Sequence, residues 1–199
     1  MTIPANWTGI LLAAGRGRRF DPLGDEDKLR QILPGGSSVA CHSAAQLQAV
    51  LPDLCVVVRP DNQQLIRQLQ QNDYPVLVCS QADDGMASSL TAALLQTKDS
   101  AGWIVALADM PFVQQTTIAL VLQALRNGAD IVVPVFEGRR GHPVGFSRRH
   151  LPELLCLTGD QGARQLLQKY PVLEVVVNDP GILQDIDEPA DLQAYLHKT

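Results

Sequence analysis

Short apolar runs alternate with helical patterns through residues 8–127 of this 199-residue chain, and this alternation is its most constraining feature. Continuous apolar runs predict strands that are buried on both faces, as in a parallel sheet. Parallel strands joined by right-handed helical crossovers predict a three-layer α/β/α sandwich with a Rossmann-like, mostly parallel sheet. The predicted strands are 8–14, 54–59, 76–79 and 103–108, and the predicted helices are 39–50, 62–71, 86–96 and 114–127. A ligand crevice is expected at the carboxyl ends of these strands.

The pattern changes after Gly128. A strand at 130–134, a turn at 137–141 and a returning strand at 143–146 predict a β-hairpin insertion. The chain is expected to close with helices at 151–157 and 162–170, a strand at 172–177 and a helix at 189–197. No repeat or linker interrupts this order, so residues 1–199 are expected to form a single domain.

Composition restricts the partners. Apolar residues make up 46% of the chain, enough for a full core, and the net charge is −5. Nucleic-acid binders neutralise phosphates with clustered Lys and Arg, so a nucleic-acid partner is not expected. A small phosphorylated ligand remains compatible, because it needs only a few local cations and backbone N–H groups. Without a basic and apolar leader or an apolar run of membrane-spanning length, we expect a cytoplasmic protein without a membrane partner.

The first predicted strand leads into a loop rich in glycine and arginine, residues 15–20, and Lys28 follows. Glycines allow backbone N–H groups to approach a phosphate chain, and Arg19 and Lys28 would neutralise it. A Walker P-loop requires G-K-[ST], which is absent, and a dinucleotide fingerprint requires a third small residue where Phe20 stands. The remaining alternative is a solvated basic turn. The loop suits a triphosphate best.

Six segments stand out along the chain. They are the first loop, Leu11–Phe20, and then Gly85–Leu90, Ala108–Pro111, Gly141–Pro143, Gly159–Arg164 and Asp185–Pro189. In this order they resemble the signature segments of the MobA-like nucleotidyltransferases, and most closely those of the MocA-type molybdenum cofactor cytidylyltransferases. The resemblance spans nearly the whole chain and implies a fold like that of the nucleotide-diphospho-sugar transferases.

The resemblance implies a nucleotide site built from the first loop and a later helix start. The segment beginning at Gly85 opens a helix, where free N–H groups allow a ring or ribose to approach, and by resemblance it contacts the nucleobase. A plain serine N-cap is the alternative there. The expected nucleotide-binding residues are Leu12, Ala13, Ala14, Gly15, Gly17, Arg19, Lys28, Gly85, Ser88 and Ser89, and the expected catalytic residues are Lys28, Arg19 and Asp109.

Two carboxylates form the expected metal site. Asp109 follows a predicted strand, so its side chain should project into the crevice, and Asp187 precedes the last helix. Mg²⁺ takes one or two carboxylates together with phosphate oxygens and water, so Mg²⁺ or Mn²⁺ is the expected cofactor. Helix capping is the alternative role for both residues, and Asp185 is a substitute ligand.

Two segments are expected to bind the acceptor. Gly141, His142 and Pro143 resemble the acceptor-facing segment of the family, although an idle histidine in a surface turn is equally compatible. Asp160, Gly162 and Arg164 form the second candidate, in which the arginine would grip a phosphate. A helix cap with a surface arginine is the alternative for this second segment.

The implied reaction is transfer of CMP from CTP to the phosphate of molybdopterin, with release of pyrophosphate. The sequence Ala13-Ala14-Gly15 resembles the cytidylyl branch rather than the guanylyl branch. The alternatives are guanylyl transfer or transfer to another phosphorylated acceptor, a molybdenum cofactor carrier or chaperone, and a MobA-like oxidoreductase. A molybdoenzyme or its chaperone is a further expected partner.

The chain departs from the family pattern before Lys28. The segment 21–27 is longer than usual and carries four acidic residues. Unneutralised carboxylates would repel a triphosphate, so we expect these residues to face solvent or to pair with Arg16 or Arg18. The added length costs little closure entropy, so Lys28 can still reach the site.

Overall fold

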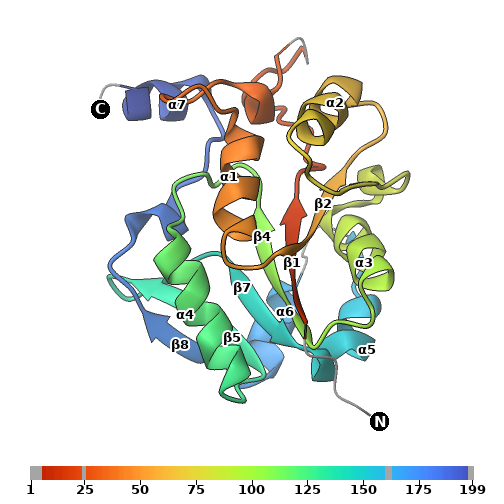
Figure 1. The fold of residues 1–199 in the computed structure, drawn as a ribbon, viewed down its shortest axis with the longest axis vertical. Coiled ribbons are helices and arrows are strands. Elements are labelled where there is room, and N and C mark those ends of the chain that lie inside the picture. Colours follow the sequence, from red (N-terminus) through yellow and green to blue (C-terminus); the bar gives the residue numbers. More distant parts are fainter. Residues whose placement is uncertain (1–5, 24–25, 160–162, 197–199) are drawn as a thin grey trace.

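The computed structural model describes residues 6–23, 26–159 and 163–196 (Figure 1). The strands are β1 (Trp7–Leu12), β2 (Asp53–Val58), β3 (Val76–Val78), β4 (Gly102–Leu107), β5 (Ile131–Phe136), β6 (Arg139–Arg140), β7 (Val144–Ser147) and β8 (Leu173–Val176). The α-helices are α1 (Val39–Gln48), α2 (Gln63–Gln71), α3 (Met86–Gln96), α4 (Gln115–Arg126), α5 (Leu151–Leu155), α6 (Arg164–Lys169) and α7 (Pro189–Leu196). Short 3₁₀ helices are η1 (Lys28–Arg30), η2 (Ala82–Asp84), η3 (Arg148–His150) and η5 (Pro180–Leu183).

The strands form one eight-stranded sheet in the order β3-β2-β1-β4-β7-β5-β6, with β8 paired to β5. The first four strands are parallel, as the continuous apolar runs predict. Leu12 at the end of β1 lies in register with Val57 on one side and Leu107 on the other. The segments that leave β1 and β4 therefore emerge next to each other at one edge of the sheet.

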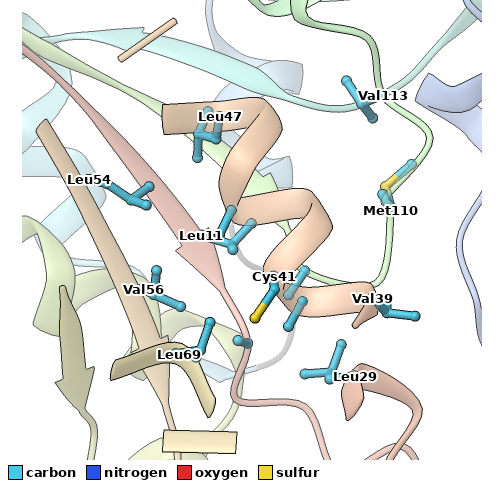
Figure 2. Close-up of a cluster of buried hydrophobic side chains, with 14 of the residues drawn as sticks. Leu11, Leu29, Val39, Cys41, Leu47, Leu54, Val56, Leu69, Met110 and Val113 are labelled. Atoms are coloured by element: carbon cyan, nitrogen blue, oxygen red, sulfur yellow. The ribbon is translucent and has the colours of Figure 1, made fainter. Parts of the chain in front are cut away.

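Helices cover both faces of the sheet, which confirms the three-layer prediction. Helices α1, α2 and α4 pack on one face with Leu11, and α3, α5 and α6 pack on the other with Ile10. Figure 2 shows side chains from the first of these two layers, with Leu47 of α1 close to the sheet residues Leu11 and Leu54. Successive strand residues point to opposite faces, so β1 contributes to both layers and is buried between them.

The predicted returning strand lies within the main sheet rather than in an insertion. β5 and β6 form an antiparallel hairpin, but β7 lies between β4 and β5 and is antiparallel to both. Trp103 of β4 faces Phe146 of β7 in this register, and both are fully buried. In an appended hairpin, Phe146 would lack a second layer of side chains to cover it. Its position in the main sheet allows it to be buried, and burial of such a side chain stabilises a fold by about 1.5–3 kcal/mol.

Within the described part of the chain, no helix combines the length and the hydropathy that a membrane span requires.

Candidate functional site

A cavity of about 730 Å³ opens at the carboxyl ends of β1 and β4. In Figure 1 the arrow of β1 points toward this end of the molecule, where α7 also lies. Four segments enclose the cavity: the loop from β1 into η1, the segment from η2 into α3, the end of β4 with the residues after it, and the chain before α7. The lining residues are Leu12, Ala14, Gly15, Arg16, Gly17, Arg18, Arg19, Lys28, Leu29, Ala82, Asp83, Gly85, Met86, Ser89, Leu107, Asp109 and Asp187.

Sheet register brings the two principal strand-end segments together. The Ala13 amide donates to the Val57 carbonyl at 2.9 Å, and the Ala108 amide donates to the Leu12 carbonyl at 3.0 Å. These hydrogen bonds extend the backbone pairing of the sheet by one residue beyond β1 and β4. The chain therefore leaves the sheet at Ala14 and at Asp109. Both residues therefore line the cavity, whereas Ala13 is buried beneath it.

Lys28 lies at the centre of the site. It begins η1, whose N-cap Asp27 accepts the Leu29 amide at 2.9 Å and the side-chain amide of Asn62 at 2.6 Å. The neighbouring Leu29 is buried in the core. Lys28 is also turned inward, and only 7% of it is exposed. The longer acidic segment therefore does not keep Lys28 out of the cavity.

The Lys28 ammonium bridges two carboxylates. Its Nζ lies 2.6 Å from Asp109 Oδ2 and 2.7 Å from Asp187 Oδ1. Arg19 approaches the other oxygen of Asp187 at 2.8 Å, while its own side chain remains 75% exposed. The capping alternative does not describe Asp109, because the N-cap of α4 is Gln114. Before α7, Asp191 accepts the backbone amides of Asp187 and Glu188.

The charges in this cluster hold each other in their ionised forms. Burial disfavours a charged Lys28, but Asp109 and Asp187 outweigh burial and raise the pKa of the lysine. Burial also opposes ionisation of Asp187, yet the hydrogen bond from Lys28 and the charge of Arg19 lower the pKa of this carboxyl. For Asp185, burial and the neighbouring Asp187 raise the pKa. Near neutral pH the site therefore holds a protonated Lys28 beside the ionised carboxylate of Asp187.

The two carboxylates fit a divalent cation. Asp109 and Asp187 present oxygen atoms around a single point, now held by the Lys28 ammonium, and both border the cavity. Among the described residues no group of three His, Cys, Asp or Glu side chains encloses a metal position by itself. Mg²⁺ and Mn²⁺ sites in phosphoryl-transfer enzymes commonly use one or two carboxylates and take further oxygens from the phosphates. The donor set therefore suits a cation that arrives with a phosphate ligand.

The η2–α3 segment forms the opposite wall. Gly85 takes φ of +109° and begins α3 without a side-chain cap, so the serine N-cap alternative is wrong here. Ser89 is buried and lines the cavity, whereas Ser88 does not line it. Met86 is 43% exposed at the cavity wall.

An ion pair joins the two walls of the cavity. Arg16 Nε lies 2.7 Å from Asp83 Oδ1, a second nitrogen contacts the other Asp83 oxygen, and Asp61 lies 3.7 Å away. Of the two expectations for the acidic segment 21–27, solvent exposure or pairing with Arg16 or Arg18, these contacts do not show the pairing with Arg16, because they join Arg16 to Asp83 and Asp61. Asp21 instead accepts backbone amides of its own loop, and Glu26 is exposed.

Sequence reasoning missed several lining residues on both walls. They are Arg16, Arg18, Leu29, Ala82, Asp83, Met86 and Leu107. The glycine- and arginine-rich loop was a signal for the two arginines. No spacing rule marks Asp83, because its position depends on how two distant loops fold together.

Those expected acceptor residues that the structure describes, Gly141, His142, Pro143 and Arg164, do not line this cavity. Gly141 packs against η5, where an added Cβ would lie 2.3 Å from the Ile182 carbonyl. His142 borders a separate small cavity with Pro143, and its buried Nδ1 has no hydrogen-bond partner in the described structure. Arg164 is exposed at the start of α6. Asp160 and Gly162 lie outside the described residues.

Comparisons with known proteins agree with this geometry. Residues 9–175 match the MobA-like NTP transferase domain. The purine catabolism protein PucB of Bacillus subtilis is 29% identical over 198 residues, which cover 92% of each chain. The nicotine blue oxidoreductase of Paenarthrobacter nicotinovorans is 29% identical over 193 residues, which cover 90% of this chain and 91% of that protein.

Solved structures give the same fold. Rv0371c from Mycobacterium tuberculosis superposes with a TM-score of 0.84 and 25% identity, over 99% of this chain and 100% of that one. A structure of Rv0371c in complex with manganese has a TM-score of 0.79 and 25% identity, over 98% of this chain and 100% of that one.

Proposed function

This chain belongs to the MobA-like NTP transferase family, and from that premise we propose that residues 1–199 act as one domain that transfers CMP from CTP to the phosphate of molybdopterin. The observation that carries this proposal is the buried Lys28 ammonium, held between Asp109 and Asp187 at the base of a cavity. A charged cluster of this kind is suited to neutralising phosphate oxygens rather than to stabilising the fold, because burying ions is costly.

The triphosphate binds along the first loop in this proposal. Gly17 has a left-handed backbone with φ of +61°, and an added Cβ at Gly15 would meet no atom within 4 Å. The loop therefore lets phosphates come close to its backbone N–H groups. Arg19 has a mostly exposed guanidinium that can turn to the phosphate chain, while Lys28 reaches the α-phosphate from below.

The transfer step needs no covalent enzyme intermediate. An acceptor phosphate oxygen bonds to the α-phosphorus of CTP, the bond from that phosphorus to the bridging oxygen breaks, and pyrophosphate leaves with the electron pair. The attacking oxygen is already ionised near neutral pH, so no residue has to remove a proton. Lys28 and Arg19 position the phosphates and stabilise the negative charge of the transition state.

Asp109 and Asp187 would hold the divalent cation. Mg²⁺ or Mn²⁺ supplies charge neutralisation and orientation of phosphate oxygens when bound. The manganese complex of Rv0371c supports the choice of a divalent ion. Because Lys28 occupies the point between the two carboxylates, its ammonium and a divalent cation would compete for these oxygens.

The cytosine preference rests on the small residues beside the cavity. Ala14, Gly15 and Gly85 leave room for a ring against backbone groups, and Ser89 offers a hydroxyl. The resemblance of Ala13-Ala14-Gly15 to the cytidylyl branch supports CTP. The acceptor assignments to Gly141–Pro143 and to Asp160, Gly162 and Arg164 stay predictions that rest on resemblance.

The relative named nicotine blue oxidoreductase supports a second candidate, reduction or oxidation of a heterocycle. The first loop resembles half of a dinucleotide fingerprint, but Phe20 is buried where that fingerprint requires a third small residue. A passive cofactor carrier is the third candidate. The carboxylate–lysine cluster favours phosphoryl chemistry over both.

Pyrophosphate release tests the three candidates together. The protein is incubated with Mg²⁺ or Mn²⁺, each of the four nucleoside triphosphates, and molybdenum cofactor, with NADH and NADPH oxidation followed in parallel. We expect pyrophosphate only with cofactor present, fastest with CTP, and greater thermal stabilisation by CTP than by GTP. Faster release with GTP would assign the guanylyl reaction. Cofactor binding without pyrophosphate would assign the carrier role.

A further inference from the structure

Asp179 is a buried carboxylate that the proposed transfer does not use. It is 1% exposed, and no cationic nitrogen lies within 4.0 Å of it in the described part of the chain. Three donors compensate for its burial. Oδ2 accepts the Gln114 amide at 2.9 Å and the Thr117 hydroxyl at 2.6 Å, and Oδ1 accepts the Gly181 amide at 3.0 Å. A buried charge persists only with such hydrogen bonds.

These three donors come from two segments that each lead to a carboxylate of the site. Gln114 caps α4 and ends the loop that begins at Asp109. Gly181 lies in η5, whose N-cap is Asp179 itself, and the chain continues from η5 to Asp187. One side chain therefore fixes the far end of both segments relative to each other.

Close backbone contacts continue this link toward the site. A Cβ on Gly181 would lie 2.1 Å from the Phe112 carbonyl, so the two segments touch at that point. Nearer the cavity, the Ile186 amide donates to the Asp109 carbonyl at 2.8 Å. The segments are thus joined at Asp179, at Gly181 and at Ile186, which directly precedes Asp187.

We propose that Asp179 is a positioning residue that sets the spacing between the carboxylates of Asp109 and Asp187. It acts on the reaction only through these two residues, and this role rests on the proposed function. Preorganised charges lose their effect when their spacing changes, and a displacement of about 1 Å can cost on the order of 100-fold in rate.

Asp179→Asn tests the link with little change in volume. Asparagine offers one acceptor oxygen in place of two, so at least one of the three donors loses its partner. Thr117→Val removes a single hydrogen bond and leaves the carboxylate in place. Thr91→Val is the matched control, because the Thr91 hydroxyl in α3 is buried without a hydrogen-bond partner in the described structure.

The first readout is amide hydrogen exchange at Ile186, measured on the full chain without substrate. In Asp179→Asn we expect exchange at Ile186 to accelerate about tenfold or more relative to β1 and β4, as a local opening would produce. Thr117→Val should give a smaller acceleration, and Thr91→Val none. Unchanged Ile186 exchange, or an equal acceleration across all strands, overturns the proposal.

The second readout is the kinetics of pyrophosphate release, well below the melting temperature of each variant. We expect Asp179→Asn to lower kcat about 10- to 100-fold and to raise the half-saturating Mn²⁺ concentration, with KM for CTP within about threefold. A variant that melts earlier but keeps kcat and its Mn²⁺ dependence would show a structural role only. If the unmutated protein releases no pyrophosphate, the proposed function fails, whereas the exchange measurement still decides the coupling.

Discussion

The region expected to bind the nucleotide and the region expected to bind the acceptor differ in how closely their residues come together. Most of the nucleotide set converges, because Gly15, Lys28 and Asp109 line one cavity although they belong to distant parts of the sequence, while Ala13 and Ser88 do not line it. The described residues of the acceptor set do not converge there. His142 is directed to a separate cavity and Arg164 is exposed on α6. Residues that directly follow buried parallel strands are placed by sheet register, whereas residues in turns and short helices are placed by contacts that no local pattern encodes.

The sharpest test of the convergent side is removal of a carboxylate. We expect Asp109→Asn and Asp187→Asn each to lower kcat by at least about 1,000-fold, because each carboxylate serves both the divalent cation and Lys28. Pyrophosphate release measures the effect, and circular dichroism checks the fold. Near-normal turnover in either variant would remove that carboxylate from the metal site.

Lys28→Ala is expected to have the next largest effect on kcat. Loss of one preorganised charge-stabilising donor should lower kcat about 100- to 1,000-fold, or about 3–4 kcal/mol, with a smaller loss of CTP affinity. The nucleotide-free variant should also bind Mn²⁺ more tightly than the unmutated protein, since the ammonium no longer competes for the two carboxylates.

Mn²⁺ titration followed by electron paramagnetic resonance measures this competition without any turnover. Turnover within two- or threefold of normal would show that Arg19 and the metal neutralise the phosphates without Lys28. Weaker Mn²⁺ binding in the variant would show that the lysine does not occupy the cation position.

A pair of arginine variants compares the two sets directly. Arg19→Ala should lower kcat/KM for CTP about tenfold, as expected for loss of one charge-assisted hydrogen bond. Arg164→Ala should leave the KM for CTP within about twofold, because this side chain lies outside the cavity. The KM for the acceptor then decides the role of Arg164. A tenfold or larger rise in the KM for the acceptor would support a role of Arg164 in binding the acceptor.

The smallest expected effect concerns His142 and pH. Burial lowers the pKa of His142 below the ordinary 6.5, although the negative charge of Asp109 acts in the opposite direction. As pH falls through 6.5, the unfolded chain takes up a proton that the folded chain resists, so the free energy of unfolding decreases. His142→Gln should reduce this loss of stability between pH 7.5 and 5.5. Each kcal/mol that the titration of His142 contributes to the loss corresponds to roughly 2–4 °C in Tm.

His42→Gln is measured alongside His142→Gln for comparison, because burial also lowers the pKa of His42. If the melting temperatures of the unmutated protein and His142→Gln run parallel across the whole pH range, His142 does not titrate with folding.

The amino-acid pattern predicts the parallel half of the sheet well, because its strands are continuous apolar runs, and β1, β2 and β4 are mostly buried. It misplaces the returning strand, since β7 pairs with β4 across a sequence gap that local periodicity does not record. Within the site, Asp109 and Lys28 follow from strand ends and resemblance. Asp83 and Asp179 do not, because their partners lie 67 and 62–65 residues away and depend on the finished fold.

The two partners of Lys28 lie 81 and 159 residues further along the chain. At about 5–20 residues per second, synthesis of the segment between those partners takes on the order of ten seconds. A nascent chain in this interval holds the lysine and the first carboxylate but lacks the second, and for most of the interval it also lacks Asp179. The cluster is therefore incomplete, and its chemistry is withheld, until translation has passed Asp187.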